Sequence, residues 1–186
     1  MEETRPPPMP ESSSAEYLII ASSLKPVSFS RIMADALREA YETLAVSHRM
    51  IDLRRHTLPL CDGEAAYEHP QVATLTEIIE AARVIVIATP VYNFDANAAV
   101  KNLIELTGGA WENKVVGFLC AAGGVSSYMS IMALANSLML DFRCLIVPRF
   151  VYAHSEDFDD ERRPGSSLAE RIRQLADTTL TIRNAV

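Results

Sequence analysis

Five short apolar runs alternate with five segments of helical periodicity, and this alternation constrains the fold more than any other feature of the sequence. The runs that we interpret as strands are Tyr17–Ala21, Val46–Leu53, Val84–Pro90, Lys114–Cys120 and Cys144–Pro148. The segments with apolar residues at helical spacing are Phe29–Leu44, Val72–Ala82, Ala96–Leu106, Ser127–Leu140 and Leu168–Ile182. Alternating strands and helices form a parallel sheet that is covered on both faces. We therefore predict an α/β fold with a doubly wound, five-stranded parallel sheet of order 2-1-3-4-5.

The length of 186 residues is about that of one domain, and 49% hydrophobic with 22% charged residues is ordinary globular usage. Residues 1–15 are rich in proline and serine and contain almost nothing to bury. We predict a disordered tail there, with binding of a partner through PPPMP as the alternative. Residues 16–186 are then the folded domain.

Charge and cysteine usage exclude several classes of protein. The net charge of −7 and a pI near 5.1, with no long Lys/Arg run, argue against nucleic-acid binding. No apolar run approaches the ~20 residues that span a membrane, and the N-terminus lacks the pattern of a signal peptide. The three cysteines show no C-x-x-C spacing and the histidines no metal-ligand spacing, so we expect buried free thiols and no metal site. The sequence predicts a soluble, cytoplasmic protein.

Ligands of doubly wound sheets bind at the carboxyl ends of the strands, so the loops after the first, third and fourth strands are the candidate site. The first loop, Ser22–Arg31, supplies several serine hydroxyls, one cation in Lys25 and the start of a helix near Ser28–Ser30. Hydroxyls and the free N–H groups of a helix N-terminus can bind a phosphate. The alternative is a serine N-cap on an ordinary turn.

The other two loops favour a flat ring. Pro90 ends the third strand and is followed by Tyr92 and Asn93, an aromatic and an amide that suit a ring with polar edges. The pair Gly123 and Gly124 follows the fourth strand and lets a ligand approach the backbone closely. Each loop alone could be an ordinary turn, but together they have the arrangement in which a flavodoxin-like sheet holds FMN.

With these motifs the sequence resembles the NADPH-dependent FMN reductases, over roughly residues 17–147. SSLKPVSFS aligns without a gap with the family's first loop, G-S-x-R-x-x-S-x-N, and PVYN with AVKNLIE at Ala99–Glu105 corresponds to P-x-Y-N followed by A-x-K-N-x-I. The resemblance implies hydride transfer from NADPH or NADH to FMN, and from there reduction of a small-molecule acceptor such as free flavin, a quinone, an azo compound or a metal ion. It implies no catalytic acid or base. The cofactor-binding residues that it implies are Ser23, Lys25, Ser28, Ser30, Pro90, Val91, Tyr92, Asn93, Gly123 and Gly124.

The sequence departs from the family pattern in the first two loops. Ser22 replaces the usual glycine and Lys25 the usual arginine, so a point charge stands in place of a bidentate fork. Phe94 and Asp95 replace the small residues that often follow P-x-Y-N. These changes affect the expected acceptor more than the expected fold.

Two other functions remain open at this point. One is a non-enzymatic, flavodoxin-like FMN electron carrier, although the T-x-T-G-x-T first loop of flavodoxins is absent. The other is an interaction module without flavin that works through its proline tail. Purified protein would distinguish them by its flavin absorbance and its consumption of NADPH.

Two further segments predict surfaces. The fourth helical segment is apolar nearly all round, which predicts burial on both sides and hence a homodimer or a dimer of dimers, with a covering loop as the alternative. Glu156–Glu161 holds five acidic residues in six and predicts a solvated loop, with a cation site as the alternative.

Overall fold

The predicted parallel sheet is present, and two short strands are added to it. The computed structural model describes residues 15–185, so the predicted tail lies, except for Ala15, outside the described residues. The strands are β1 (Tyr17–Ala21), β2 (His48–Asp52), β3 (Val84–Tyr92), β4 (Asp95–Ala96), β5 (Val115–Ala121), β6 (Leu145–Ile146) and β7 (Val151–Ala153). The α-helices are α1 (Phe29–Thr43), α2 (Pro70–Ala81), α3 (Ala98–Thr107), α4 (Met132–Phe142) and α5 (Ser166–Ala185).

The order β2-β1-β3-β5-β6, with every neighbouring pair parallel, corresponds to the predicted order 2-1-3-4-5. Two segments occupy the position of the fifth strand: β6 pairs with the start of β5, and β7 pairs with its end. Pro148 lies between them, and a proline cannot donate a ladder hydrogen bond. The predicted run Cys144–Pro148 therefore contains only the first of the two segments.

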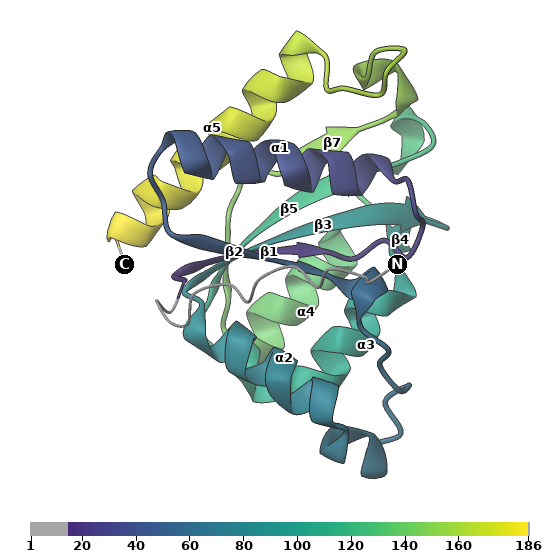
Figure 1. The fold of residues 1–186 in the computed structure, drawn as a ribbon, viewed down its shortest axis with the longest axis vertical. Coiled ribbons are helices and arrows are strands. Elements are labelled where there is room, and N and C mark those ends of the chain that lie inside the picture. The colour runs from purple at the N-terminus through teal and green to yellow at the C-terminus, as the bar shows by residue number, and fades with distance from the viewer. Residues whose placement is uncertain (1–14, 186) are drawn as a thin grey trace, which may run out of the picture.

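Helices cover both faces of the sheet (Figure 1). Alternate residues of the central strands point to opposite faces. Tyr17, Ile19 and Val86 pack with α1 and α5, whereas Leu18, Ile20 and Ile85 pack with α2, α3 and α4. Both layers are built from fully buried side chains, which explains why the central strands are continuous apolar runs.

The start of the fourth helix was predicted too early. We expected it near Ser127, but α4 begins at Met132, after a short 3₁₀ turn at Val125–Ser127. The N–H groups of Ser130 and Met132 bond to the carbonyls three residues earlier, so this stretch is wound as separate tight turns. The third loop is longer as a result.

Candidate active site

A cavity of about 380 Å³ lies at the carboxyl ends of the strands, where the three predicted loops meet. This edge of the sheet is at the right of Figure 1. Six of the ten predicted binding residues line the cavity, namely Lys25, Ser28, Pro90, Val91, Tyr92 and Gly123. Its other lining residues are Val27, Phe29, Ile32, Ala121, Ala122, Ser155 and Arg162.

The serines of the first loop hold its shape. Ser28 occupies the N-cap position of α1, and its hydroxyl bonds to the hydroxyl of Ser30 at 2.9 Å. Ser23 accepts a hydrogen bond of 3.3 Å from the backbone N–H of Lys25. Ser23 and Ser30 are buried and do not line the cavity. Of the three predicted serines, Ser28 therefore lines the cavity, whereas Ser23 and Ser30 are buried beneath its wall.

The electrostatics of the cavity favour an anion. The N-terminus of the 15-residue helix α1 opens onto it, since Ser28 and Phe29 are both lining residues. Among the described residues, no carboxylate lines the cavity, and two cationic residues, Lys25 and Arg162, do. In a protein whose net charge is −7, this is a locally positive hollow at a helix N-terminus.

The second loop is a tight hairpin, which the sequence analysis did not predict. Residues Tyr92 and Asp95 pair across a two-residue turn, Asn93–Phe94, and β4 runs back antiparallel to β3. Both turn residues have positive φ, 50° for Asn93 and 65° for Phe94. Such a turn matches the twist of the strands and favours asparagine first and glycine second, so Phe94 is the unusual residue. Asn93 lies at the tip of this turn and does not line the cavity.

The third loop presents bare backbone. A Cβ added to Gly123 would meet no atom within 4 Å, so the backbone there faces open space on the cavity side. Gly124 does not line the cavity, but its carbonyl accepts a hydrogen bond from the hydroxyl of Tyr152 on β7. The ring of Tyr152 also contacts that of Tyr128. Tyr152 therefore holds the loop at Gly124, while the backbone at Gly123 remains accessible from the cavity.

A buried polar network that the sequence analysis missed joins the first and second loops. Asn97, which precedes α3, accepts from the hydroxyls of Ser22 at 2.7 Å and Thr89 at 3.1 Å, and its amide donates to the Ser22 carbonyl at 2.8 Å. All three residues are buried. Ser22, where the family usually has glycine, is thus used as a hydrogen-bonding residue. A lone asparagine before a helix gave no sequence signal beyond that of a possible cap.

Two more cavity residues, Ser155 and Arg162, come from the segment after β7 and were also missed. Their segment contains the acidic run Glu156–Glu161, which we interpreted as a solvated loop. Most of the run is exposed, but Phe158 is buried and packs on Phe29 at a ring-centroid distance of 4.3 Å. The run is therefore attached to the start of α1 at the cavity.

Two of the three cysteines have thiol pKa values well above the ordinary one. Cys61, Cys120 and Cys144 are free, and the last two are buried as predicted. Burial raises the pKa of the Cys120 thiol to about 12 and that of the Cys144 thiol to about 11. Both stay protonated near neutral pH.

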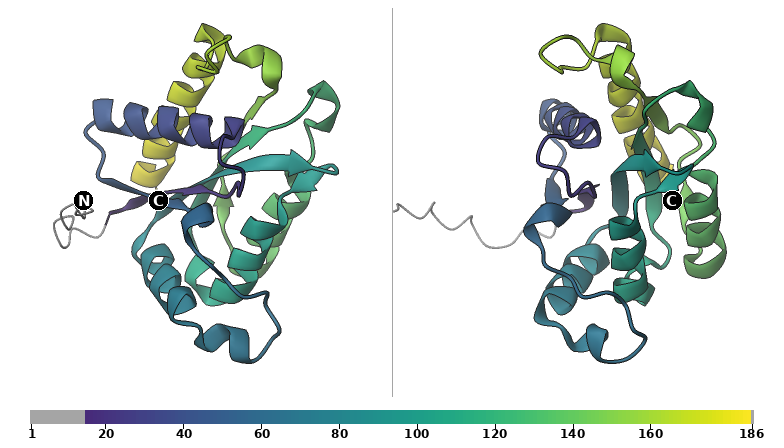
Figure 2. Two further views of the ribbon diagram at one scale, coloured as in Figure 1. Left: turned by 45° about the vertical axis from the view of Figure 1, so that its right-hand side comes forward. Right: turned by 90° about the vertical axis from the view of Figure 1, so that its right-hand side faces the viewer.

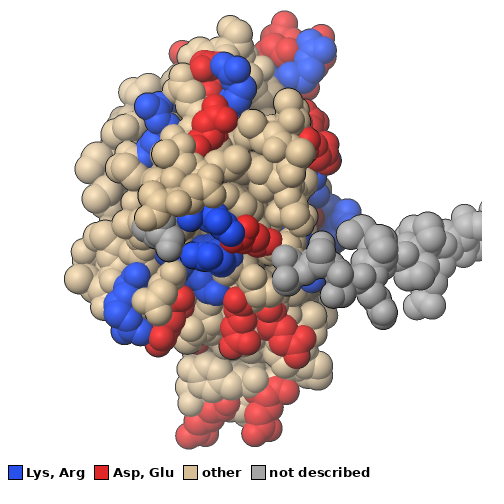
Figure 3. Space-filling view, turned by 90° about the vertical axis from the view of Figure 1, so that its left-hand side faces the viewer, with Lys and Arg blue, Asp and Glu red and all other residues tan. Residues whose placement is uncertain are grey.

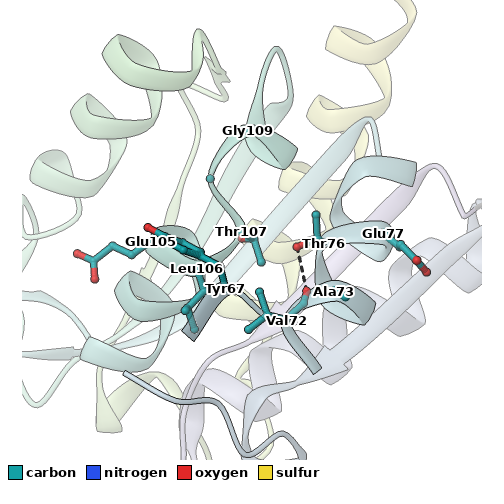
Figure 4. Close-up of a pocket in the computed structure, with 10 residues that line it drawn as sticks. Tyr67, Val72, Ala73, Thr76, Glu77, Glu105, Leu106, Thr107 and Gly109 are labelled. Carbon is teal, nitrogen blue, oxygen red and sulfur yellow. Dashed lines mark hydrogen bonds between the residues drawn. The ribbon is translucent and has the colours of Figure 1, made fainter. Parts of the chain in front are cut away.

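A second hollow, of about 580 Å³, lies between α2 and α3 (Figure 4). In the part of the chain that the structure describes, its lining includes Glu77 and Glu105 and no Lys or Arg. Thr76 lines this hollow, but its hydroxyl already donates a hydrogen bond to the Val72 carbonyl at 2.9 Å. This hollow therefore does not suit an anionic ligand.

Lys and Arg side chains also gather at the amino ends of the strands (Figure 3). There Arg183 donates to the Glu16 carboxylate at 2.5 Å, and Lys114 donates to the Ala82 carbonyl at 2.6 Å. These cations have protein partners, whereas the side chains of Lys25 and Arg162 have none among residues 15–185. Within residues 15–185, no helix is long and apolar enough to cross a membrane, and no group of three or more His, Cys, Asp or Glu residues is placed to hold a metal ion.

Comparison with known proteins agrees with the resemblance. The family model for NADPH-dependent FMN reductases matches residues 16–159, so the family predicted from the three loops is confirmed. A reviewed relative, the NAD(P)H-dependent FAD/FMN reductase of Geobacillus thermodenitrificans, is 28% identical over 134 residues, which cover 70% of this chain and 72% of the relative.

Solved structures share the fold. An oxidoreductase from Corynebacterium diphtheriae superposes with a TM-score of 0.73 at 21% identity, over 91% of this chain and 99% of that one. The flavoenzyme NAD(P)H:(acceptor) oxidoreductase FerB from Paracoccus denitrificans gives a TM-score of 0.72 at 18% identity, over 89% of this chain and 94% of that one. Together with the strand order, these likenesses confirm the flavodoxin-like α/β fold.

Proposed function

The chain belongs to the NADPH-dependent FMN reductase family, and on this premise we propose that residues 16–186 form an FMN-binding domain whose cofactor lies in the cavity at the strand ends. As a member of this family, the protein is an NAD(P)H-dependent FMN reductase, an oxidoreductase that uses FMN and NAD(P)H. Family membership therefore favours the enzyme over the non-enzymatic electron carrier.

The phosphate of FMN would lie at the N-terminus of α1. The backbone N–H groups of the first turn that have no partner among the described residues would bind the anion there. Ser28 lines this part of the cavity, and Lys25 would supply a positive charge. Ser23 and Ser30 would contribute indirectly by orienting the loop, because each bonds to a residue that lines the cavity. The observation that carries this placement is that Lys25 and the N-terminus of α1 line the same cavity.

The flavin ring would lie between the second and third loops. Pro90, Val91 and Tyr92 give one wall of the cavity, and Gly123 gives backbone without a side chain on the other. Asn93 and Gly124 are placed to shape these walls, one at the tip of the hairpin and the other bonded to Tyr152. An apolar wall with accessible backbone suits a flat heterocycle that has hydrogen-bonding edges.

When bound, FMN would accept a hydride from NAD(P)H and deliver the electrons to a second acceptor, a small molecule such as free flavin, a quinone, an azo compound or a metal ion. The residues that line the cavity would bind the phosphate and orient the ring. No side chain needs to act as an acid or a base for these steps, and we assign none.

Flavin titration of the purified chain tests the proposal. FMN added to flavin-free protein should lose fluorescence saturably, and the chain should oxidise NADPH only when FMN is present. A protein that binds no flavin would refute the placement. A protein that binds FMN but does not pass electrons from NADPH to it would be an electron carrier.

The assembly that we propose is a homodimer, or a dimer of dimers, formed through α4. The outward side of this helix exposes Met132, Met139 and Leu140, and Met129 just before the helix is also exposed. The helix lies at the outer edge of the molecule in the right-hand view of Figure 2. A row of exposed apolar side chains on a surface helix is typical of a subunit interface.

We also propose a cytoplasmic location. All three cysteines are free, and free thiols persist in reducing compartments.

A further inference from the structure

One cationic side chain that lines the cavity, that of Arg162, belongs to none of the family motifs. Arg162 lines the cavity together with Lys25 and Ser28, although it lies far from them in the sequence. Within residues 15–185, neither Arg162 nor Lys25 forms an ion pair. This is unexpected for Arg162, because five of the six residues before it in the chain are acidic.

Three of the five acidic residues pair with other arginines. The Arg163 guanidinium contacts the carboxylates of Asp159 and Glu161, each at 2.8 Å. Asp157 accepts from Arg171 at 2.5 Å. Asp157, Asp159 and Glu161 thus pair with Arg171 and Arg163 and not with Arg162.

The backbone separates the two neighbouring arginines. Arg162 has a φ of 62°, a left-handed conformation that is strained for a residue other than glycine. Its N–H bonds to the Asp159 carbonyl at 2.8 Å, and the Asp159 N–H bonds to the Arg163 carbonyl at 2.9 Å, which closes a tight turn. Across this turn, the Arg163 side chain pairs with the carboxylates of Asp159 and Glu161, and Arg162 lines the cavity. A strained residue held by its surroundings is a common feature of binding sites.

The loop is fixed to the part of the structure that would hold the phosphate. Phe158 packs on Phe29, the first residue of α1, and Phe158 also bridges to Pro164 across the turn. Gly165 donates to the Asp157 carbonyl at 2.9 Å, and an added Cβ there would lie 3.1 Å from that oxygen. Arg162 is therefore carried by an anchored loop and not by a free one.

We propose that Arg162 is a phosphate-binding residue that completes the FMN phosphate site together with Lys25 and the N-terminus of α1. This inference rests on the proposed placement of FMN. Arg162 offers the planar, bidentate group that Lys25 lacks, and so supplies from the C-terminal part of the chain what the first loop has lost by its exchange of arginine for lysine. The ligand is the phosphate monoester of the flavin and not its ring.

Comparison of FMN with riboflavin, which lacks the phosphate, tests this assignment. Flavin-free full-length protein is titrated with each flavin by fluorescence quenching, for the wild type, Arg162→Asn, Arg162→Lys and Arg173→Asn. Asparagine tolerates a positive φ, so Arg162→Asn removes the charge without adding backbone strain. Arg173→Asn is the matched control, because Arg173 is an exposed arginine of α5 that pairs only with Glu170 among the described residues.

We expect Arg162→Asn to weaken FMN binding about tenfold and to change riboflavin binding by less than about twofold. Arg162→Lys should recover part of the loss, and Arg173→Asn should bind both flavins as the wild type does. The preference of the wild type for FMN over riboflavin should also fall as salt is added.

Two results would overturn the inference. One is an equal loss of affinity for riboflavin in Arg162→Asn, and the other is unchanged affinity of this variant for FMN. In the second case, a raised KM for NADPH would place the contact on the dinucleotide. Wild-type protein that binds neither flavin would instead refute the placement of FMN itself, so the two failures can be told apart.

Discussion

Ser22 and Asn97 bond to each other in both directions, with the Ser22 hydroxyl donating to Asn97 Oδ1 at 2.7 Å and the Asn97 amide donating to the Ser22 carbonyl at 2.8 Å. The pair is buried and connects the end of β1 to the start of α3, which are 75 residues apart in sequence. The first loop and the hairpin after β3 are therefore positioned relative to each other by one asparagine side chain.

Replacing Asn97 by alanine should destabilise the fold. The change leaves the Ser22 carbonyl and two hydroxyls with fewer partners in a buried place, and we expect a loss of about 2–3 kcal/mol in the free energy of unfolding. Urea unfolding of the flavin-free chain measures it. Asn184→Ala, at an exposed asparagine of α5, is the control and should stay within about 0.5 kcal/mol of the wild type. Equal stability of Asn97→Ala and the wild type would show that the network is not needed.

Phe94→Gly should stabilise the protein. Phe94 has a φ of 65° in the two-residue turn, where glycine is the favoured residue. Relief of the left-handed strain exceeds the extra chain entropy of glycine, so we expect a gain of about 0.5–1 kcal/mol in thermal or urea unfolding. Phe94→Ala keeps the Cβ and its strain while removing the ring, and should show no such gain. The same gain in both variants would assign the effect to the exposed ring.

Lys25→Arg should tighten FMN binding. A guanidinium can bond to two phosphate oxygens at once, whereas the ammonium of lysine acts as a point charge. We expect the Kd for FMN to fall about threefold and that for riboflavin to stay unchanged, by fluorescence titration. Lys25→Met should have the opposite effect on FMN alone. A Kd for FMN that is the same in all three proteins would exclude Lys25 from the phosphate site.

Charges on the outer side of α4 should separate the subunits. With Met132→Glu and Met139→Glu combined, two like-charged rows would face each other across the proposed interface, and we expect monomers in sedimentation velocity where the wild type forms dimers. Leu60→Glu is the matched control, because Leu60 is 82% exposed and lies on the loop between β2 and α2. A wild type that sediments as a monomer, or a variant that remains dimeric, would contradict the α4 interface.

The parts of this molecule that were predictable are those set by local pattern. β1, β3 and β5 are buried on both faces, so each is an apolar run that the sequence displays directly, and the strand order followed from the rules of parallel sheets. The three loops could be located because the carboxyl ends of parallel strands share one edge. The split of the fifth strand around Pro148 and the late start of α4 depend on pairings between distant segments, which periodicity does not report.

The missed residues of the candidate site share one physical cause. Asn97 acts through partners 75 and 8 residues away, and Arg162 reaches the cavity because Phe158 packs on Phe29. Neither arrangement leaves a mark on neighbouring residues in the sequence. An acidic run that ends in two arginines indicates a solvated loop, and only the turn at Asp159–Arg163 shows that one arginine faces the cavity.

The buried thiol of Cys120 should make the protein less stable in alkali. Its pKa is about 12 in the folded protein, against an ordinary value of 9.0, so above about pH 9 the unfolded chain releases a proton that the folded chain keeps. Unfolding is therefore favoured as the pH rises, by about 1.4 kcal/mol for each pH unit well above the ordinary pKa.

In Cys120→Ala this contribution is removed, while those of the other buried groups remain and cancel in the comparison. We expect the stability advantage of the wild type over Cys120→Ala to shrink by about 1.4 kcal/mol between about pH 8 and pH 10, measured by urea unfolding under reducing conditions. The control is Leu119→Ala, a neighbouring buried truncation without a titrating group, whose difference from the wild type should not depend on pH. If the Cys120→Ala difference were equally constant, the thiol would ionise alike in both states, and the burial of β5 at the edge of the cavity would be less complete in solution than in the structure.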